Sequence, residues 1–293
     1  MCKECGCGLG GKVTIGGPSH KHAHDHGHSH EHGHSHDDDH GHGHSHDQEH
    51  GHGHHHEHPT EAAHSHGRQT VSLQRSLLDK NARQAEQNRG FFRAKNLLVL
   101  NVVSSPGSGK TTFIRETAIK LADRLRVGVI VGDLATDNDA ARLRTAGIPV
   151  IQITTGTVCH LDAEMISRAA AQINLDLVDV LVIENVGNLV CPADYDLGED
   201  LRVVLLSVTE GEDKPLKYPP MFHSAQVAII TKSDMAVAAG FDRAVALANL
   251  GRASHHATIF ELSAKTGEGM TAWLDYLKAG LEKKRQMAPA KLK

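Results

Sequence analysis

From residue 96 onward, short apolar runs alternate with segments whose apolar residues recur at helical spacing. The runs are Leu97–Val103, Val127–Val131, Val150–Ile153, Val178–Ile183, Val203–Val208, Val227–Thr231 and Thr258–Leu262. Most are continuous and do not alternate with polar positions, which is typical of parallel strands covered on both faces. The pattern predicts an α/β fold with a doubly wound, mostly parallel sheet and connections on both sides.

A helix is predicted upstream of the first strand, over residues 70–92. Its apolar face would be formed by Val71, Leu73, Leu77, Leu78, Ala82 and Ala85. Arg89 and Gly90 fit a helix C-terminus, and Phe91 and Phe92 follow them. We expect this helix to pack on the α/β domain; binding to a partner is the less favoured alternative.

Composition separates the first part of the chain from the rest. Of the 25 histidines, 21 lie between His20 and His66, together with nine Asp or Glu residues and one lysine. A segment with almost no apolar residues cannot offset the entropy of ordering, so it is predicted to be disordered. The remaining residues, about 200, suit one α/β domain.

Charge and cysteine content narrow the class of protein. The net charge is −4 and no basic patch stands out, so nucleic acid is not a favoured partner. No apolar run is long enough to cross a bilayer and no signal-peptide core follows Met1, so we expect a cytoplasmic protein. Five cysteines, an odd number, favour thiolate metal ligands over a disulfide framework.

The first predicted strand leads into Ser104–Thr112, and a helical pattern follows. Strand, glycine-rich turn, Lys-Thr and helix are the layout of a phosphate-binding loop. Gly107 and Gly109 let backbone N–H groups curl around a phosphate. Lys110 adds positive charge and Thr111 offers a hydroxyl to Mg²⁺. The predicted nucleotide contacts in this loop are Gly107, Ser108, Gly109, Lys110, Thr111 and Thr112. Ser104 replaces the usual first glycine of the motif, and an ordinary glycine-rich turn is the alternative.

Acidic residues end two further predicted strands, at the sheet edge where ligands of such folds bind. Asp133 and Glu184 can each reach the Mg²⁺ of a bound nucleotide. For Asp133, capping of the next helix is an alternative. Gly187 can turn its N–H toward a γ-phosphate, as the glycine of a switch loop does. Together with Lys110, these residues are the candidate catalytic set.

Two loops predict that the base is guanine. Thr231-Lys232-Ser233-Asp234 is similar to the Asn-Lys-x-Asp motif of GTPases, with Thr in place of Asn. The carboxylate of Asp234 can accept hydrogen bonds from the guanine N1–H and amino group, which adenine does not offer in this pattern. Ser263-Ala264-Lys265 matches the second base-contacting loop. The sequence therefore favours GTP over ATP.

The amino-terminal segment carries candidate metal ligands. Cys2, Cys5 and Cys7 form a flexible cluster of thiols, which suits zinc, copper(I) or nickel. A half-formed zinc site and a redox cysteine pair are the alternatives. The His-rich tract that follows is predicted to bind several metal ions with low specificity. A purification tag or a solvated spacer would explain its length and mixture of residues less well.

A second candidate metal site lies among the predicted strand ends. Cys159 and His160 follow the third strand, and Cys191 follows the fourth strand and Gly187. A buried free thiol is the alternative for each cysteine. Three ligands of this type would leave one position open for water or for a ligand from a second subunit.

These motifs together resemble those of one family, the HypB nickel-incorporation GTPases of hydrogenase, within the SIMIBI class of P-loop GTPases. The resemblance rests on Cys-x-x-Cys-Gly-Cys-Gly at 2–8 and on residues 104–112, 136–140, 159–162, 184–192 and 210–219. It implies GTP hydrolysis coupled to nickel delivery into [NiFe]-hydrogenase, with Mg²⁺ as cofactor. It also implies a GTP-linked homodimer, a HypA-type metallochaperone and the hydrogenase large-subunit precursor as partners, and nickel or zinc at Cys159, His160 and Cys191. Because no arginine finger is visible, the intrinsic rate is expected to be slow.

The domain organisation predicted on this basis has five parts. They are a cysteine motif at 1–11, a His-rich tail at 12–67, a helix at 68–95, a P-loop GTPase domain at 96–287 and a C-terminal tail at 288–293. Two other functions stay open. One is metal storage or detoxification, and the other is nickel insertion of the urease type, whose metal loop would be expected to read Cys-Pro-His.

Overall fold

The computed structural model describes residues 13–16 and 62–287, with side chains of the helical segment described from Arg75 onward. The chain divides into two compact units, one of residues 1–18 and 74–293 and one of residues 19–73. The first unit contains all of the strands and every helix apart from the start of the first one. The predicted cysteine motif, most of the His-rich tail and the C-terminal tail at 288–293 lie outside the described residues.

Within the described residues, eight strands form one sheet in the order β1-β4-β3-β5-β2-β6-β7-β8. The strands are β1 Thr14–Gly16, β2 Leu98–Ser104, β3 Val127–Asp133, β4 Val150–Thr154, β5 Val180–Glu184, β6 Leu201–Ser207, β7 Val227–Thr231 and β8 Thr258–Leu262. All neighbouring pairs are parallel except β1 with β4. The prediction of a mostly parallel sheet is confirmed, whereas β1 was not predicted.

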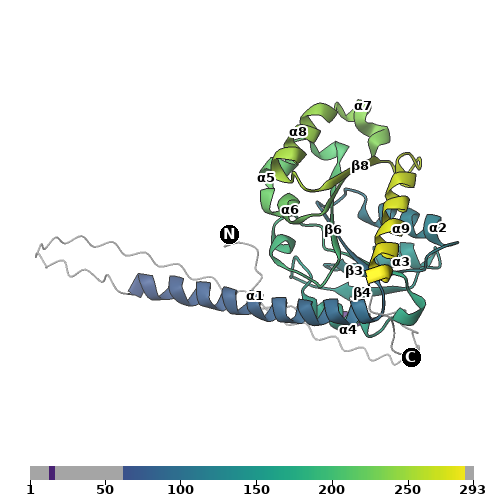
Figure 1. Cartoon of the computed structure of the whole chain (residues 1–293). Helices are drawn as coiled ribbons and strands as arrows, with labels where there is room; N and C mark the ends of the chain where they lie inside the picture. Colours follow the sequence, from purple (N-terminus) through teal and green to yellow (C-terminus); the bar gives the residue numbers. More distant parts are fainter. Residues whose placement is uncertain (1–12, 17–61, 288–293) are drawn as a thin grey trace, which may run out of the picture. The chain divides into compact units, whose positions relative to one another are not determined.

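Helices cover both faces of the sheet (Figure 1). They are α1 Ala62–Ala94, α2 Lys110–Leu121, α3 Asn138–Arg144, α4 Ala163–Ala170, α5 Lys214–Lys217, α6 Pro219–Ser224, α7 Ala236–Ala239, α8 Arg243–Ala253 and α9 Met270–Met287, with 3-10 turns η1 Leu175–Leu177, η2 Cys191–Asp194, η3 Val208–Glu210 and η4 Ser233–Met235. Side chains of β2 alternate between faces: Leu98 and Leu100 join the core under α2 and α9, and Val99 joins the core under α1 and α4. The sheet is therefore doubly wound, as predicted.

The helix before the first parallel strand differs from its prediction. It runs through Gly90 and ends after Ala94, where Asn96 adopts a left-handed backbone conformation with φ of 56°. Its buried residues are Asn81, Ala85, Asn88 and Phe92, whereas Leu77 is 60% exposed. The predicted apolar face is therefore confirmed at Ala85 but wrong at Leu77 and Ala82, which are exposed, because the buried face of α1 also pairs asparagine side chains with the domain backbone.

The packing of α9 fixes the helix that follows the phosphate loop. Trp273 of α9 is fully buried, and its indole N–H donates to Thr117 Oγ1 of α2 over 3.1 Å. Its ring packs beside Phe113 of α2 and Phe260 of β8. Burying two large aromatic rings here stabilises the domain by several kcal/mol, on the order of 1.5–3 each. As a result, the N-terminus of α2 is held rigidly at the edge of the sheet.

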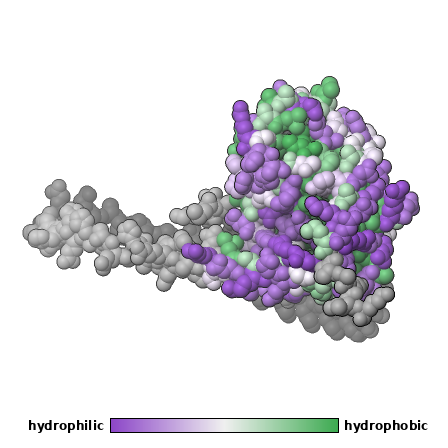
Figure 2. Space-filling view, in the orientation of Figure 1, coloured by the Kyte–Doolittle hydropathy of each residue, from purple (hydrophilic) through white to green (hydrophobic). Residues whose placement is uncertain are grey.

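The surface is mixed in character. Figure 2 shows a largely hydrophilic face with apolar residues gathered at the end of the view where α7 and α8 lie. Val237 of α7 is 98% exposed, and Met235 just before this helix and Val245 of α8 are also exposed. Among the described helices, none combines the length and apolar character needed to span a bilayer.

Candidate functional site

The phosphate loop Ser104–Thr112 connects β2 to α2, as predicted. Gly107 and Gly109 have φ values of 75° and 94°, which a residue with a Cβ adopts only with strain. Lys110 is 9% exposed, and its Nζ donates to Ser104 Oγ over 3.0 Å. Burial lowers the pKa of Lys110, and the nearby Glu184 carboxylate opposes that shift. Ser104, where the motif usually has glycine, thus supplies an oxygen that accepts a hydrogen bond from the lysine.

Thr111 and Glu184 meet at the start of α2. The Thr111 hydroxyl donates to Glu184 Oε1 over 2.7 Å, and Glu184 is 2% exposed. Burial raises the pKa of Glu184 to about 7, against the hydrogen bond from Thr111 and the charge of Lys110. Among the described residues, Glu184 Oε2 is buried with no hydrogen-bond partner. A hydroxyl beside a buried carboxylate with one unused oxygen is a donor set that fits Mg²⁺.

Asp133 and Gly187 take up different positions at the same edge. Asp133 Oδ1 accepts hydrogen bonds from the backbone N–H groups of Ala135 and Thr136, at 3.0 and 2.8 Å. It therefore closes its own turn, and the alternative that it caps the next helix is wrong because the N-cap of α3 is Asp137. Gly187 packs on the phosphate loop, since a Cβ there would lie 3.1 Å from Pro106 Cα. The catalytic roles of these residues stay predictions.

The two predicted guanine loops follow the neighbouring strands β7 and β8. The Thr231 hydroxyl donates to the Ser108 carbonyl over 3.0 Å, and Lys232 Nζ donates to the Gly107 carbonyl over 2.8 Å. Both residues therefore brace the phosphate loop. Asp234 is exposed at η4. On the other loop, Ser263 is fully buried and accepts from the Thr266 N–H over 3.2 Å, while Ala264 is half-buried and Lys265 exposed.

Cys159, His160 and Cys191 come together although 32 residues separate the two cysteines. Their ligand atoms lie within 4.8 Å of one another. The two sulfurs are 3.0 Å apart, longer than the roughly 2.05 Å of a disulfide. His160 is buried, and burial lowers the pKa of its imidazole, so the ring is held neutral as a metal ligand requires. Its Nδ1 has no hydrogen-bond partner among the described residues.

Neighbouring residues that the sequence patterns did not single out hold these ligands. The ring of Tyr195 stacks on His160 with centroids 3.9 Å apart. The amide of Asn188 donates to the Cys159 carbonyl over 3.3 Å, and Asn185 Oδ1 accepts from the Leu161 N–H over 3.3 Å. Both asparagines lie in the predicted switch segment between Glu184 and Cys191, so the repeat of Asn around Gly187 was the available signal. Cys2, Cys5 and Cys7 lie outside the described residues.

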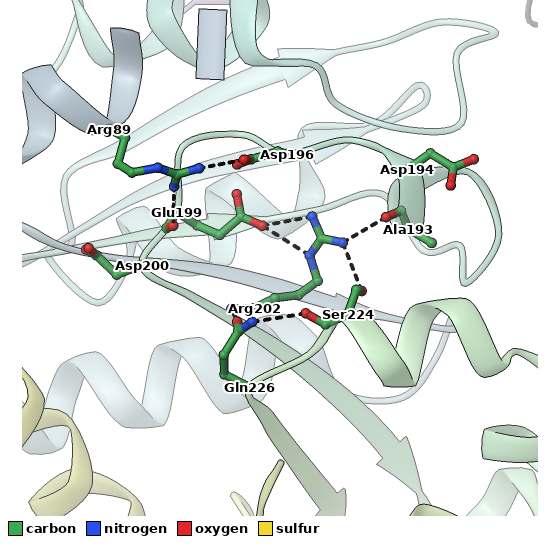
Figure 3. A pocket seen from close by; sticks show the side chains of 9 residues that line it. All are labelled: Arg89, Ala193, Asp194, Asp196, Glu199, Asp200, Arg202, Ser224 and Gln226. Carbon is green, nitrogen blue, oxygen red and sulfur yellow. Dashed lines mark hydrogen bonds and ion pairs between the residues drawn. The ribbon is translucent and has the colours of Figure 1, made fainter. Parts of the chain in front are cut away.

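A polar cavity of about 360 Å³ lies beside the metal-ligand segment, at the start of β6, away from the phosphate loop (Figure 3). Arg202 crosses it and forms a buried ion pair with Glu199 at 2.9 Å. The same guanidinium donates to the carbonyls of Ala193 and Tyr195, at 3.0 and 2.7 Å. Because these charges are paired with one another, the cavity wall serves to fix the segment that carries Cys191 and Tyr195.

Comparison with known proteins places this geometry in a family. A family model described as "CobW/HypB/UreG, nucleotide-binding domain" matches residues 98–261. The hydrogenase maturation factor HypB of Escherichia coli is 51% identical over 210 residues, 72% of each chain. The chain belongs to the HypB family. The hydrogenase/urease maturation factor HypB of Helicobacter pylori is 42% identical over 74% of this chain and 89% of its own.

A comparison with solved structures supports the same family and fold. A crystal structure of the Helicobacter pylori HypB in complex with nickel has a TM-score of 0.67 and 41% identity, covering 73% of this chain and 99% of its own. The predicted P-loop GTPase fold is thereby confirmed for this HypB-family protein. Within that fold, Cys159, His160 and Cys191 form a candidate metal centre on two of the loops that leave the carboxyl ends of the strands.

Proposed function

We propose that this protein is a GTP-hydrolysing nickel metallochaperone that stores nickel and delivers it during maturation of [NiFe]-hydrogenase. One observation carries the proposal. A single segment that begins at the last residue of β5 contains Glu184 beside Thr111, Gly187 against Pro106, and Cys191 beside Cys159. A change at the nucleotide therefore has a short covalent path to a metal ligand.

GTP and Mg²⁺ are the proposed partners of the phosphate loop. Lys110 would bind the β- and γ-phosphates once it leaves Ser104, and Asp234 would read guanine. Thr111 and Glu184 would hold Mg²⁺, which neutralises phosphate charge when it is bound. With no arginine finger assigned, we propose a slow intrinsic rate, on the order of 10⁻⁴ to 10⁻³ per second.

Nickel is the proposed cargo of Cys159, His160 and Cys191, with Zn²⁺ as the competing occupant. Two thiolates and one imidazole are ligands that both metals accept. Support for nickel comes from the related HypB of Helicobacter pylori, whose structure is described as a complex with nickel. Three ligands leave a position open, which water or a second subunit of a GTP-linked homodimer would fill.

The amino-terminal cysteines and the His-rich tract are proposed as the nickel reservoir. The register of β1 supports this, because Thr14 lies opposite Thr154, the last residue of β4. The chain thus enters β1 at the sheet edge from which Cys159 departs. Cys7 precedes Thr14 by seven residues, which an extended chain spans in at most about 25 Å.

The proposal also includes two protein partners and a cellular compartment. A HypA-type metallochaperone and the hydrogenase large-subunit precursor would exchange nickel with this protein in the cytoplasm. A specific observation also favours a second role, since the relative from Helicobacter pylori is named a hydrogenase/urease maturation factor. Storage without delivery is the remaining alternative. Lys110→Ala separates the two classes: nickel storage survives in either case, but hydrogenase maturation fails only if delivery needs the nucleotide.

The decisive experiment measures nickel at the domain site alone, in the full chain. Replacing Cys2, Cys5 and Cys7 by serine leaves Cys159 and Cys191 as the only thiols. Sulfur-to-nickel charge-transfer absorption then reports this site and ignores the histidines of the tail. We expect a saturable band that disappears in Cys159→Ser, with a nickel affinity that differs at least about fivefold between GDP and a non-hydrolysable GTP analogue.

Two results would overturn the proposal. A missing band in the triple-serine protein would remove the metal site. Equal nickel affinities with GDP and with the GTP analogue would remove the coupling on which nickel delivery depends.

A further inference from the structure

Two asparagines on α1 bridge the same pair of segments. Asn81 accepts a hydrogen bond from the Ala163 N–H at 2.8 Å and donates to the Asp196 carbonyl at 2.8 Å. Asn88, two helical turns further on, donates to the Ala163 carbonyl at 2.7 Å and to the Leu197 carbonyl at 3.1 Å. The two side chains are 8% and 3% exposed. The buried amide of Asn81 therefore connects residue 163 to residue 196, and that of Asn88 connects residue 163 to residue 197.

Both segments lead directly to the candidate metal centre. Ala163 follows His160 by three residues and begins α4. Asp196 follows Tyr195, whose ring stacks on His160, and Cys191 lies at the start of the same stretch. Asn81 and Asn88 thus connect the two segments that hold the imidazole of His160. One segment carries His160 itself, and the other carries Tyr195, which stacks on it.

The contact between α1 and the 196–199 stretch leaves no space for adjustment. Gly198 has φ of 88°, and a Cβ there would lie 2.7 Å from the Ala85 carbonyl oxygen and from Asn88 Cβ. Arg89 donates to the Glu199 carbonyl at 2.9 Å and pairs with the Asp196 carboxylate (Figure 3). Gln84 donates to Asn88 Oδ1 at 3.1 Å and so fixes the orientation of that amide.

We propose that Asn81 and Asn88 are positioning residues for the metal centre, and that α1 through them sets the geometry and affinity of Cys159, His160 and Cys191 for a borderline divalent metal. The inference rests on the proposed metal site, and it adds that α1 orients the residues of that site.

The chemistry of the contact favours this role over simple packing. This face of α1 buries the apolar residues Ala85 and Phe92, which covering the sheet requires. It also buries two amides, which satisfy four backbone groups and which coverage alone does not need. Residues that orient metal ligands from outside the coordination shell typically change metal affinity by about 10–100-fold when they are removed.

The test uses the full chain with Cys2, Cys5 and Cys7 replaced by serine, and Co²⁺ and Ni²⁺ as probes. Asn88→Ala and Asn81→Ala are compared with Gln87→Ala, an exposed residue of the same helix. We expect each asparagine variant to weaken Ni²⁺ binding at least about tenfold and to shift the Co²⁺ d–d absorption bands. Gln87→Ala should leave both unchanged.

Affinity for a GTP analogue serves as the measure of folding. Within the described residues no hydrogen bond joins α1 to Ser104–Thr112, so the asparagine variants should bind the analogue as the parent does. Unchanged nickel affinity and unchanged Co²⁺ bands in both variants would overturn the inference, while Cys159→Ser still abolishing the band would leave the metal site standing. Loss of analogue binding in parallel with metal binding would assign the asparagines to general stability and would also overturn it.

Discussion

Thr231 donates its hydroxyl hydrogen bond to the carbonyl oxygen of Ser108, 123 residues earlier in the chain, over 3.0 Å. The residue that replaces the asparagine of the guanine motif therefore joins that motif to the phosphate loop. Thr231→Val keeps the shape and removes the donor, so we expect affinity for GDP to fall about fivefold, the equivalent of about 1 kcal/mol. Titration calorimetry with GDP measures the change.

Thr231→Ser is the matched control, because it keeps the hydroxyl and should retain most of the affinity. Since the hydrogen bond goes to the loop, and the base is proposed to be read by Asp234, preference for GDP over IDP should be the same in Thr231→Val and in the parent. If the valine and serine variants bind GDP equally, the hydroxyl has no role in nucleotide binding.

The contact between Gly187 and Pro106 gives a second prediction. A Cβ at residue 187 would come within 3.1 Å of Pro106 Cα and 3.2 Å of its Cγ, so Gly187→Ala must displace one of the two loops by a few tenths of an ångström. We expect GTP hydrolysis to slow about tenfold, because small misplacement around a reacting phosphate is costly, while GDP still binds. Single-turnover hydrolysis and GDP titration separate the two effects.

Gly251→Ala in α8 is the control for this change. Nothing lies within 4 Å of a Cβ built there, so hydrolysis should match that of the parent. Equal slowing by both alanines would mean that the contact with Pro106 is not responsible.

Asp179 links the starts of β3 and β5 to the carboxyl end of α9, at the edge of the sheet opposite the phosphate loop. It accepts hydrogen bonds from Arg126 at 3.1 Å and from Arg285 of α9 at 2.6 Å. Burial alone would raise the pKa of Asp179, but these hydrogen bonds outweigh it and lower the pKa to about 2. Both arginines are about half exposed, at 53% and 45%, so the stabilisation is about 1 kcal/mol, below what the pKa shift alone would imply.

A depressed carboxyl pKa stabilises the fold above the unfolded-state pKa, and the effect disappears as pH falls through the folded-state value. Asp179→Asn should therefore lower the free energy of unfolding by about 1 kcal/mol at pH 7, and the difference from the parent should shrink between about pH 4 and pH 2. Urea unfolding at several pH values measures this. The exposed Asp123, changed to Asn, should show little difference at any pH, and a constant deficit for Asp179→Asn would refute the charge-based explanation.

Much of the fold follows from the sequence because its strands are buried on both faces. Val227–Thr231 is a strand with the predicted bounds and is buried at every position. Thr258–Leu262 also has the predicted bounds, although it lies at the edge of the sheet and only Leu262 is buried. The candidate metal ligands could also be placed from the sequence. Cys159 and Cys191 follow strands β4 and β5, which flank β3, so their loops leave the same edge of the sheet.

Polar residues with buried roles could not be found in the same way. Asn81 and Asn88 belong to a helix whose predicted apolar face did not include them, and the backbone groups of residues 163, 196 and 197 provide the hydrogen bonds that allow them to be buried. The strand β1 has three residues and forms backbone hydrogen bonds with β4. A segment this short does not show the apolar pattern from which a strand is predicted. The burial of the two asparagines and the formation of β1 depend on contacts with segments distant in the sequence, which local sequence patterns do not reveal.

Gly90 tests the corrected end of α1. The helix passes through this residue to Ala94, the backbone of Gly90 is helical, and nothing lies within 4 Å of a Cβ built on it. Alanine loses less conformational entropy than glycine in a helix interior, so Gly90→Ala should raise the free energy of unfolding by about 0.5–1 kcal/mol. Thermal and urea unfolding measure the gain.

Gly240 provides the matched control, because it has equal space for a Cβ but a φ of 64° at the end of α7. Gly240→Ala should destabilise the protein by about 1 kcal/mol, since an L-residue is strained in that conformation. Both glycines are exposed and have open space around them, so they differ in backbone conformation. A stability gain for Gly90→Ala and a loss for Gly240→Ala would therefore show that Gly90 lies inside the helix. If Gly90→Ala instead lost stability as Gly240→Ala does, α1 would end at Gly90, and Phe92 would enter the core from a loop.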